Sequence, residues 1–111
     1  MNESIASSFI NRRSLAISAE LMRALAHPLR IKIINFIDSE GSSHVNKIYN
    51  SLKLEQSVTS QHLRILRNAG LVEASRQGKY IYYTINKAKI EGTCNIVEEF
   101  FKMQEQLEKA S

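Results

Sequence analysis

The 111-residue sequence predicts a single, mainly α-helical domain over residues 1–111 with one β-hairpin, on three observations. Apolar residues recur at helical spacing through most of the first half, and a short link at residues 53–55 separates two such segments. Residues 71–85 are instead rich in β-branched and aromatic residues around a Gln-Gly pair. Helical spacing then returns over about residues 87–109. Helices, a helix-turn-helix, a hairpin and a final helix, in this order, describe a winged helix.

Two adjacent residues mark the boundary between the first two predicted helices. Residues 14–26 are rich in strong helix formers and carry apolar residues at helical spacing. Pro28 has no amide hydrogen, so it suits the first position of a second helix, with His27 held extended before it. The second helix is expected to end near Gly41.

The helix-turn-helix is predicted over about residues 45–69. Its first helix is short, and we expect the hydroxyl of Ser42 or Ser43 to cap it by accepting a backbone hydrogen bond. Its second helix, about residues 56–69, is expected to end at Gly70, because glycine adopts the left-handed closing conformation most readily.

The hairpin at about residues 71–85 carries basic residues near its predicted tip. Arg76 and Lys79 bracket the Gln-Gly pair, and Gly78 allows the backbone to turn tightly. At least one face of the hairpin is expected to pack on the core, and the tyrosines of its second strand stiffen it: Tyr80, Tyr82 and Tyr83. Asn86 is expected to cap the final helix.

Positive charge is concentrated in one part of the chain, whose total net charge is +4. Residues 56–89 carry six Lys/Arg against one Asp/Glu, a net charge of +5. Residues 90–111 carry two Lys/Arg against five Asp/Glu, a net charge of −3. This distribution is typical of a surface that binds a polyanion, although a basic face without a partner would have the same composition.

The helix at residues 56–69 has a polar face without a carboxylate. At 100° per residue the centre of this face, about 60° wide, holds Ser57, Gln61, Arg64 and Asn68, flanked by Ser60 and Arg67. The opposite side, expected to pack on the domain, carries Val58, Ile65, Leu66 and Ala69. Hydroxyls, amides and guanidiniums contact base edges and phosphates, and the exposed amides of a first helical turn also favour phosphate. An ordinary solvated surface is the alternative, but we expect DNA contacts from Gln56, Ser57, Ser60, Gln61 and Arg64, with Arg76 and Lys79 beside phosphates.

The final helix carries an apolar arc that is too broad for a solvated helix. Part of this arc is expected to meet a second copy, although packing within one subunit would use the same residues. The predicted homodimer interface consists of Ile90, Cys94, Val97, Phe100, Phe101 and Leu107. Glutamates on the flank of the helix would be repelled by phosphate, which keeps this surface away from DNA. Two-fold symmetry in turn predicts a palindromic operator in double-stranded DNA.

Two stretches, "HPLRIKIINFI" and "SVTSQHLRILRNAGLVEASRQGKYIYYTI", resemble the ArsR (SmtB-type) family of bacterial transcriptional repressors. The resemblance covers roughly residues 18–105, and its most specific part is Ser-x-His-Leu-x-x-Leu-x-x-Ala-Gly-Leu-Val followed by Arg-x-Gly-Lys and paired tyrosines. It implies a homodimer whose first and last helices form the interface. It also implies binding to imperfect inverted repeats in promoters and release of DNA when an effector binds.

The metal positions of the family are occupied by unsuitable residues in this sequence. The cysteine pair that often begins the third helix corresponds to His44 and Asn46, and the Asp and His of zinc-sensing members correspond approximately to Lys87 and Lys89. Ammonium groups and amides are poor ligands for Zn²⁺ and for soft metals. The expectation is a repressor without these metal sites, without a cofactor and with an unknown effector.

The histidines and the single cysteine are predicted to have structural roles. His27 is expected to cap a helix, and His44 is expected to be exposed. His62 projects onto the apolar side of its helix, where a hydrogen-bonded packing role is expected. Cys94 lies in the apolar arc, which favours a buried, unreactive thiol, with an intersubunit Cys94 pair as the redox alternative.

Two alternative functions remain open from the sequence. One is a winged helix that binds a partner protein through an exposed apolar patch, and the other is a repressor with a redox or small-molecule effector site. An enzyme is not expected, because no nucleophile–base pair, metal cluster or phosphate loop stands out. The chain has no apolar run of roughly 20 residues, no signal-peptide pattern and one cysteine, so a cytoplasmic location without membrane contact is expected.

Overall fold

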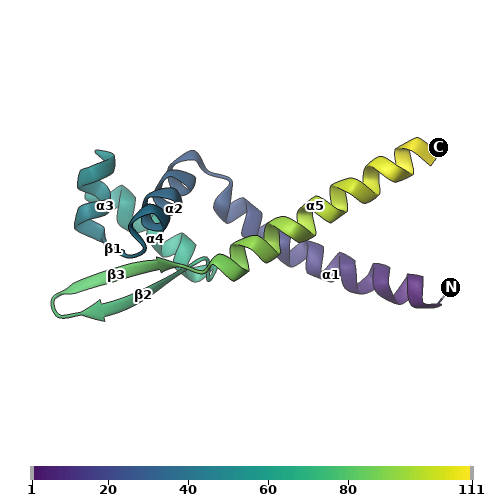
Figure 1. The fold of residues 1–111 in the computed structure, drawn as a ribbon, viewed down its shortest axis with the longest axis horizontal. Helices are drawn as coiled ribbons and strands as arrows, with labels where there is room; N and C mark the ends of the chain where they lie inside the picture. The colour runs from purple at the N-terminus through teal and green to yellow at the C-terminus, as the bar shows by residue number, and fades with distance from the viewer. Residues whose placement is uncertain (1, 111) are drawn as a thin grey trace.

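The computed structural model describes the backbone of residues 2–110 and the side chains of residues 12–110. Met1 and Ser111, the ends of the predicted domain, lie outside the described residues. In chain order the elements are α1 (Asn2–Leu25), α2 (Pro28–Glu40), β1 (Ser43–His44), α3 (Val45–Leu52), α4 (Gln56–Asn68), β2 (Val72–Gln77), β3 (Tyr80–Ile85) and α5 (Lys87–Ala110) (Figure 1). The predicted order of helices, helix-turn-helix, hairpin and final helix is confirmed. None of the described helices is both long enough and apolar enough to cross a bilayer.

The molecule is elongated because its first and last helices are long. They contact each other, and their outer halves, with both chain ends, extend to one side of the remaining elements (Figure 1). The hairpin points to the opposite side. The Cα radius of gyration is 17.5 Å, whereas a compact chain of this length has about 13 Å. Helix α1 also begins earlier than predicted, at Asn2 rather than near residue 14, because no proline or glycine interrupts the segment before it.

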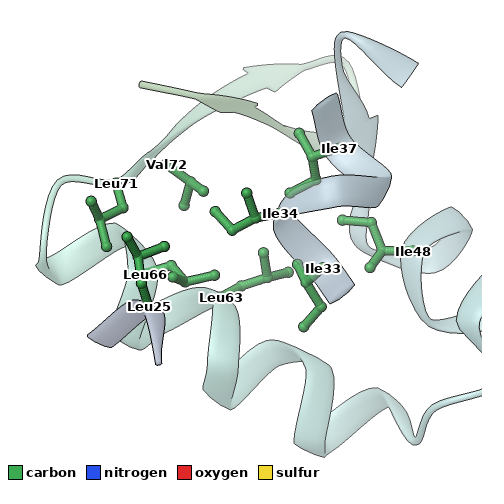
Figure 2. Close-up of a cluster of buried hydrophobic side chains, with 9 residues drawn as sticks. All are labelled: Leu25, Ile33, Ile34, Ile37, Ile48, Leu63, Leu66, Leu71 and Val72. Carbon is green, nitrogen blue, oxygen red and sulfur yellow. The ribbon is translucent and has the colours of Figure 1, made fainter. Parts of the chain in front are cut away.

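The hydrophobic core lies where α2, α3, α4 and the sheet meet the end of α1 (Figure 2). Its buried side chains are Leu25, Ile33, Ile34, Ile37, Ile48, Leu63, Leu66, Leu71 and Val72. Leu63 and Leu66 belong to α4, and both are fully buried. Each such side chain contributes about 1.5–3 kcal/mol of burial free energy, so α4 is held firmly by one face.

Several predicted helix ends are confirmed. His27 is extended and its Nδ1 accepts a hydrogen bond from the Leu29 amide at 3.2 Å, directly before Pro28. Gly70 has a φ of 75°, as its closing role requires, and the side chain of Lys89 lies against it. Asn86 Oδ1 accepts a hydrogen bond from the Lys89 amide at 3.1 Å and caps α5.

The predicted cap of α3 is wrong. Neither Ser42 nor Ser43 caps this helix; the N-cap is His44, whose Nδ1 accepts a hydrogen bond from the Lys47 amide at 3.4 Å. Ser43 is instead buried in β1, a short strand that the sequence analysis did not predict. Pairing with β3 fixes the backbone of this segment, and that pairing places His44 rather than a serine at the start of α3.

The sheet has the order β1-β3-β2, and both of its pairings are antiparallel. The sequence left the length and register of the hairpin loop open. Gln77 pairs with Tyr80, so the loop consists of Gly78 and Lys79, one residue after the Gln-Gly pair. Gly78 has a φ of 66°. A two-residue loop with glycine in this conformation at its first position is typical of a type II′ turn, which explains this position of the loop. Tyr83 packs against the core, so the prediction that one hairpin face is buried is confirmed.

Candidate nucleic-acid interface

Helix α4 presents one exposed polar face. The residues predicted to contact DNA from this helix are all exposed: Gln56, Ser57, Ser60, Gln61 and Arg64. Arg67 and Asn68, which extend the same face, are exposed as well. The face therefore offers hydroxyl, amide and guanidinium groups to a ligand, with no carboxylate within the helix.

The buried face of α4 differs in part from the predicted one. Leu66 is buried as expected, but the other fully buried residues are Thr59 and Leu63. Val58 and Ile65 are only half-buried. Thr59 is tolerated in the core because its hydroxyl donates a hydrogen bond to the Glu55 carbonyl oxygen at 2.9 Å. Helical periodicity gave the polar side of α4 correctly, whereas the centre of its buried side depends on where the core lies.

An acidic residue that the sequence analysis did not consider lies directly before α4. Glu55 is the N-cap residue, its side chain makes no capping hydrogen bond, and it is exposed. The amides of the first turn are therefore not capped by this side chain. The carboxylate nevertheless adds one negative charge beside a face that is otherwise neutral or positive, and the signal was visible in the sequence as the residue before Gln56.

The wing, defined here as β2, β3 and the turn between them, holds both predicted basic residues at exposed positions. Lys79 lies in the turn, and Arg76 lies in β2 opposite Ile81. The Lys79 Nζ is 5.6 Å from the centre of the Tyr80 ring, a cation–π contact. The structure thus separates the two cations: one lies at the tip, and the other lies on a strand two residues before the turn.

His62 of α4 has a more unusual environment than predicted. Its ring lies 4.7 Å from the ring of His27, and its Nδ1 is buried without a hydrogen-bond partner among the described residues. The predicted hydrogen-bonded packing role is therefore wrong for this nitrogen. Burial lowers the pKa of His62, and the neighbouring His27 and Arg30 lower it further.

This lowered pKa predicts that the protein loses stability in acid. The unfolded His62 binds a proton below its ordinary pKa of about 6.5, while the folded residue resists protonation. The free energy of unfolding is therefore expected to fall as the pH drops from about 6.5 through the lowered pKa. Urea denaturation at pH 7.5 and 5.5 measures the difference, and His62→Phe, which keeps a ring but does not titrate, should reduce it. An unchanged difference in the variant would show that other groups control the pH dependence.

The predicted dimer residues on α5 divide into two groups. Ile90, Val97 and Phe100 are half-buried within the subunit, and Ile90 packs against its core. Cys94, Phe101 and Leu107 are exposed. The expectation of a buried Cys94 thiol is therefore wrong for the single subunit. Phe101 is 59% exposed and Leu107 is 68% exposed, so this end of α5 carries apolar surface that the subunit does not cover.

A cavity of about 390 Å³ lies between α1 and α5. It is lined by Arg12, Ser14, Leu15, Ile96, Glu99, Phe100 and Met103. Ile17 of α1 is also exposed, by 58%. The outer halves of the two long helices therefore carry incompletely covered apolar surface on both α1 and α5.

The side chains at the positions that hold metal ligands in other family members make different contacts in this structure. Lys87 Nζ forms an exposed ion pair with Asp38 at 3.3 Å, and the Lys89 side chain lies against Gly70. His44, which was predicted to be exposed, is half-buried and stacks on Tyr80. Within the described part of the chain, no group of three or more His, Cys, Asp or Glu side chains is arranged to hold a metal ion.

Comparison with known proteins gives consistent similarities. The family model described as "Bacterial regulatory protein, arsR family" matches residues 27–74. The transcriptional repressor PagR of Bacillus anthracis is 41% identical over 88 residues, which are 79% of this chain and 88% of the relative. An HTH-type transcriptional regulator of Methanocaldococcus jannaschii, MJ1325, is 34% identical over 82 residues, which are 74% of this chain and 92% of the relative.

Solved structures show the same similarity. The crystal structure of PagR superposes with a TM-score of 0.66 and covers 78% of this chain and 98% of its own. An ArsR-like transcriptional regulator from Rhodococcus sp. RHA1 superposes with a TM-score of 0.74 over 86% of this chain and 89% of its own. At 22% identity, this second similarity concerns the fold alone.

Proposed function

This chain belongs to the arsR family of bacterial regulatory proteins, and we propose that it is a dimeric repressor that binds a palindromic operator through α4 and the wing. As a member of this family it is a DNA-binding transcriptional regulator, and an enzymatic activity is not part of the proposal. The repressor role rests on the similarity to PagR, which is a transcriptional repressor. The DNA-contacting residues and the dimer are proposed from the chemistry of the surface.

The exposed face of α4 carries the proposal. It holds Ser57, Ser60, Gln61 and Arg64 without an intervening carboxylate, and its opposite face is held in the core by fully buried residues. A rigid helix with such a face fits the major groove, where amides and guanidiniums recognise base edges. Gln56 at the first turn and the wing cations Arg76 and Lys79 would contact phosphates, which fix orientation without reading sequence.

Dimerisation is supported by the long helices. A single subunit leaves Ile17, Phe101 and Leu107 exposed on α1 and α5, and these helices extend beyond the compact part of the fold (Figure 1). A second copy related by two-fold symmetry would cover both helices and would place two α4 helices on the same side of a duplex. Half-sites about one helical turn apart, 10–10.5 bp between centres, are then expected.

We propose that no metal effector binds at the usual family positions. Lys87 and Lys89 are cations, and His44 already uses Nδ1 as an acceptor, so these side chains do not form a soft or tetrahedral site. Operator affinity is therefore expected to stay unchanged, within about twofold, when Zn²⁺ is added at micromolar concentration. A large release of DNA by Zn²⁺ would contradict this part of the proposal.

The proposed function is tested by selecting bound fragments from genomic DNA and titrating the best fragment at two salt concentrations. A footprint with two-fold symmetry is expected, together with an affinity that falls as salt rises, because bound cations release counterions. A shuffled duplex of equal length is the control, and it should bind at least about 10³-fold more weakly. Equal affinity for both duplexes, or no dependence on salt, would refute the proposal.

Gln61→Ala is expected to relax the sequence preference of the protein. A glutamine that makes a bidentate contact to adenine contributes about 1–3 kcal/mol of discrimination against other bases. Affinities for the operator and for single-base variants measure the loss. Gln106→Ala removes the same side chain from an exposed position of α5 on another side of the helix from Phe101, and it should leave the sequence preference unchanged. If Gln61→Ala leaves the preference intact, Gln61 does not read bases.

A further inference from the structure

We propose that His44 positions the wing relative to the helix-turn-helix, so that the affinity contributed by Lys79 depends on the His44 ring. The inference extends the proposed function, because it assumes that the wing contacts DNA. It assigns a positioning role to a residue that belongs to the short strand β1 and also caps α3.

The His44 ring packs on the second strand of the wing. In the β1–β3 pairing His44 lies opposite Tyr82, and the two rings meet edge to face at 5.4 Å. Tyr80 is two residues from Tyr82 and therefore projects from the same face of the strand. The rings of Tyr80 and His44 are stacked at 4.7 Å with an interplanar angle of 22°. One imidazole thus contacts two of the three aromatic residues of β3.

The same side chain is part of the helix-turn-helix. His44 is the N-cap of α3, and its Nδ1 accepts the hydrogen bond from the Lys47 amide. Lys47 in turn pairs with Glu40 of α2 at 2.7 Å. His44 therefore contacts the wing with its ring, and it contacts the start of α3 with its Nδ1 atom.

The stack continues to the wing tip. The Lys79 ammonium lies 5.6 Å from the centre of the Tyr80 ring whose packing partner is His44. Tyr80 directly follows the turn and is 39% exposed, so part of its ring stays in contact with solvent. The position of the tip cation is thus linked, through Tyr80 and His44, to the elements that hold α4.

The wing needs such a link because its backbone support is small. An isolated two-stranded hairpin is at most marginally stable, and the third strand β1 contributes two residues, Ser43 and His44. Ser43 packs into the core on the other side of the strand. Contacts of the His44 ring with Tyr80 and Tyr82 add side-chain packing to this short backbone pairing.

Two substitutions separate the ring from the cap. His44→Asn keeps a side-chain acceptor for the α3 amide but removes the ring, whereas His44→Phe keeps a ring but removes the acceptor. Each is combined with Lys79→Ala in a double-mutant cycle on the selected operator fragment. Amide hydrogen exchange of residues 79–82 in the DNA-free protein reports the order of the wing independently of DNA.

His44→Asn is expected to weaken operator binding about 2- to 12-fold, the fold-change that corresponds to about 0.5–1.5 kcal/mol for an aromatic pair. In that background the effect of Lys79→Ala should shrink to less than half, and the wing amides should exchange faster. His44→Phe should keep the wild-type affinity, the full effect of Lys79→Ala and slow exchange, although loss of the cap lowers its melting temperature.

Two outcomes would overturn the inference: equal loss of affinity in both variants, or wing exchange in His44→Asn that matches the wild type. The exchange experiment decides the matter even if no DNA fragment binds. Failure of His44→Asn to loosen the wing rejects the positioning role, while failure of the wild type to bind any fragment rejects the proposed function.

Discussion

Replacing both wing cations, Arg76→Ala with Lys79→Ala, is expected to weaken operator binding about 10- to 30-fold near physiological salt. Each phosphate contact of a cation adds about 0.9 to the slope of log affinity against log salt, so the slope should fall by about 1.8. Both residues are exposed on the wing, and within residues 12–110 neither forms an ion pair that would compete with phosphate. The loss should be similar for operator and shuffled duplexes, because phosphates carry no sequence information.

The matched control for this double substitution is Lys102→Ala with Lys109→Ala. It removes the same net charge from exposed positions on α5, where acidic residues predominate. Titrations of both variants at four salt concentrations give the two slopes directly. A control slope that falls as far as the wing slope would mean that net charge, rather than contact by the wing, controls binding.

Phe101→Glu is expected to convert the protein to a monomer at micromolar concentration and to weaken operator binding about 100-fold or more. Phe101 is 59% exposed on the subunit, and a two-fold interface would bury two copies of it. The substitution removes about 1.5–3 kcal/mol of burial per copy and places an unpaired charge in the interface. Loss of the second half-site contact removes the avidity of the dimer, which amounts to 10²–10⁴ in comparable bivalent systems.

Sedimentation velocity measures the change in association, and titration of the palindromic fragment measures the change in binding. Gln106→Glu is the matched control: it adds the same charge at an exposed position of α5 on another side of the helix. The control should remain a dimer. If Phe101→Glu also remains a dimer, α5 does not form the interface in the predicted way.

Local signals in the sequence were sufficient for the helix-turn-helix and for most helix ends. Pro28 restricts its own backbone and that of His27, and Gly70 adopts a φ of 75° that other residues disfavour. The polar side of α4 followed from helical periodicity alone, because Ser57, Gln61 and Arg64 recur at that spacing. Such features depend on a few neighbouring residues, so they can be read without knowing the fold.

Other features depended on contacts between distant segments. His44 caps α3 in place of the predicted serine, because β1 pairs with β3, about 40 residues away in the sequence. The buried face of α4 is centred on Thr59 and Leu63 rather than on the predicted residues, because the core lies between α2, α3 and the sheet. A two-residue strand has no periodicity of its own, so no pattern could have predicted it.

The family, the order of the elements, and a basic segment with a carboxylate-free helical face could all be predicted from the sequence. These properties reside in composition, in periodicity and in the φ preferences of single residues. Three other features are visible only in the folded subunit: His44 contacts both the wing and α3, His62 lies against His27, and Cys94 is exposed. The physical reason is that ring stacking, burial and pKa shifts arise from neighbours in space, which the chain brings together only when it folds.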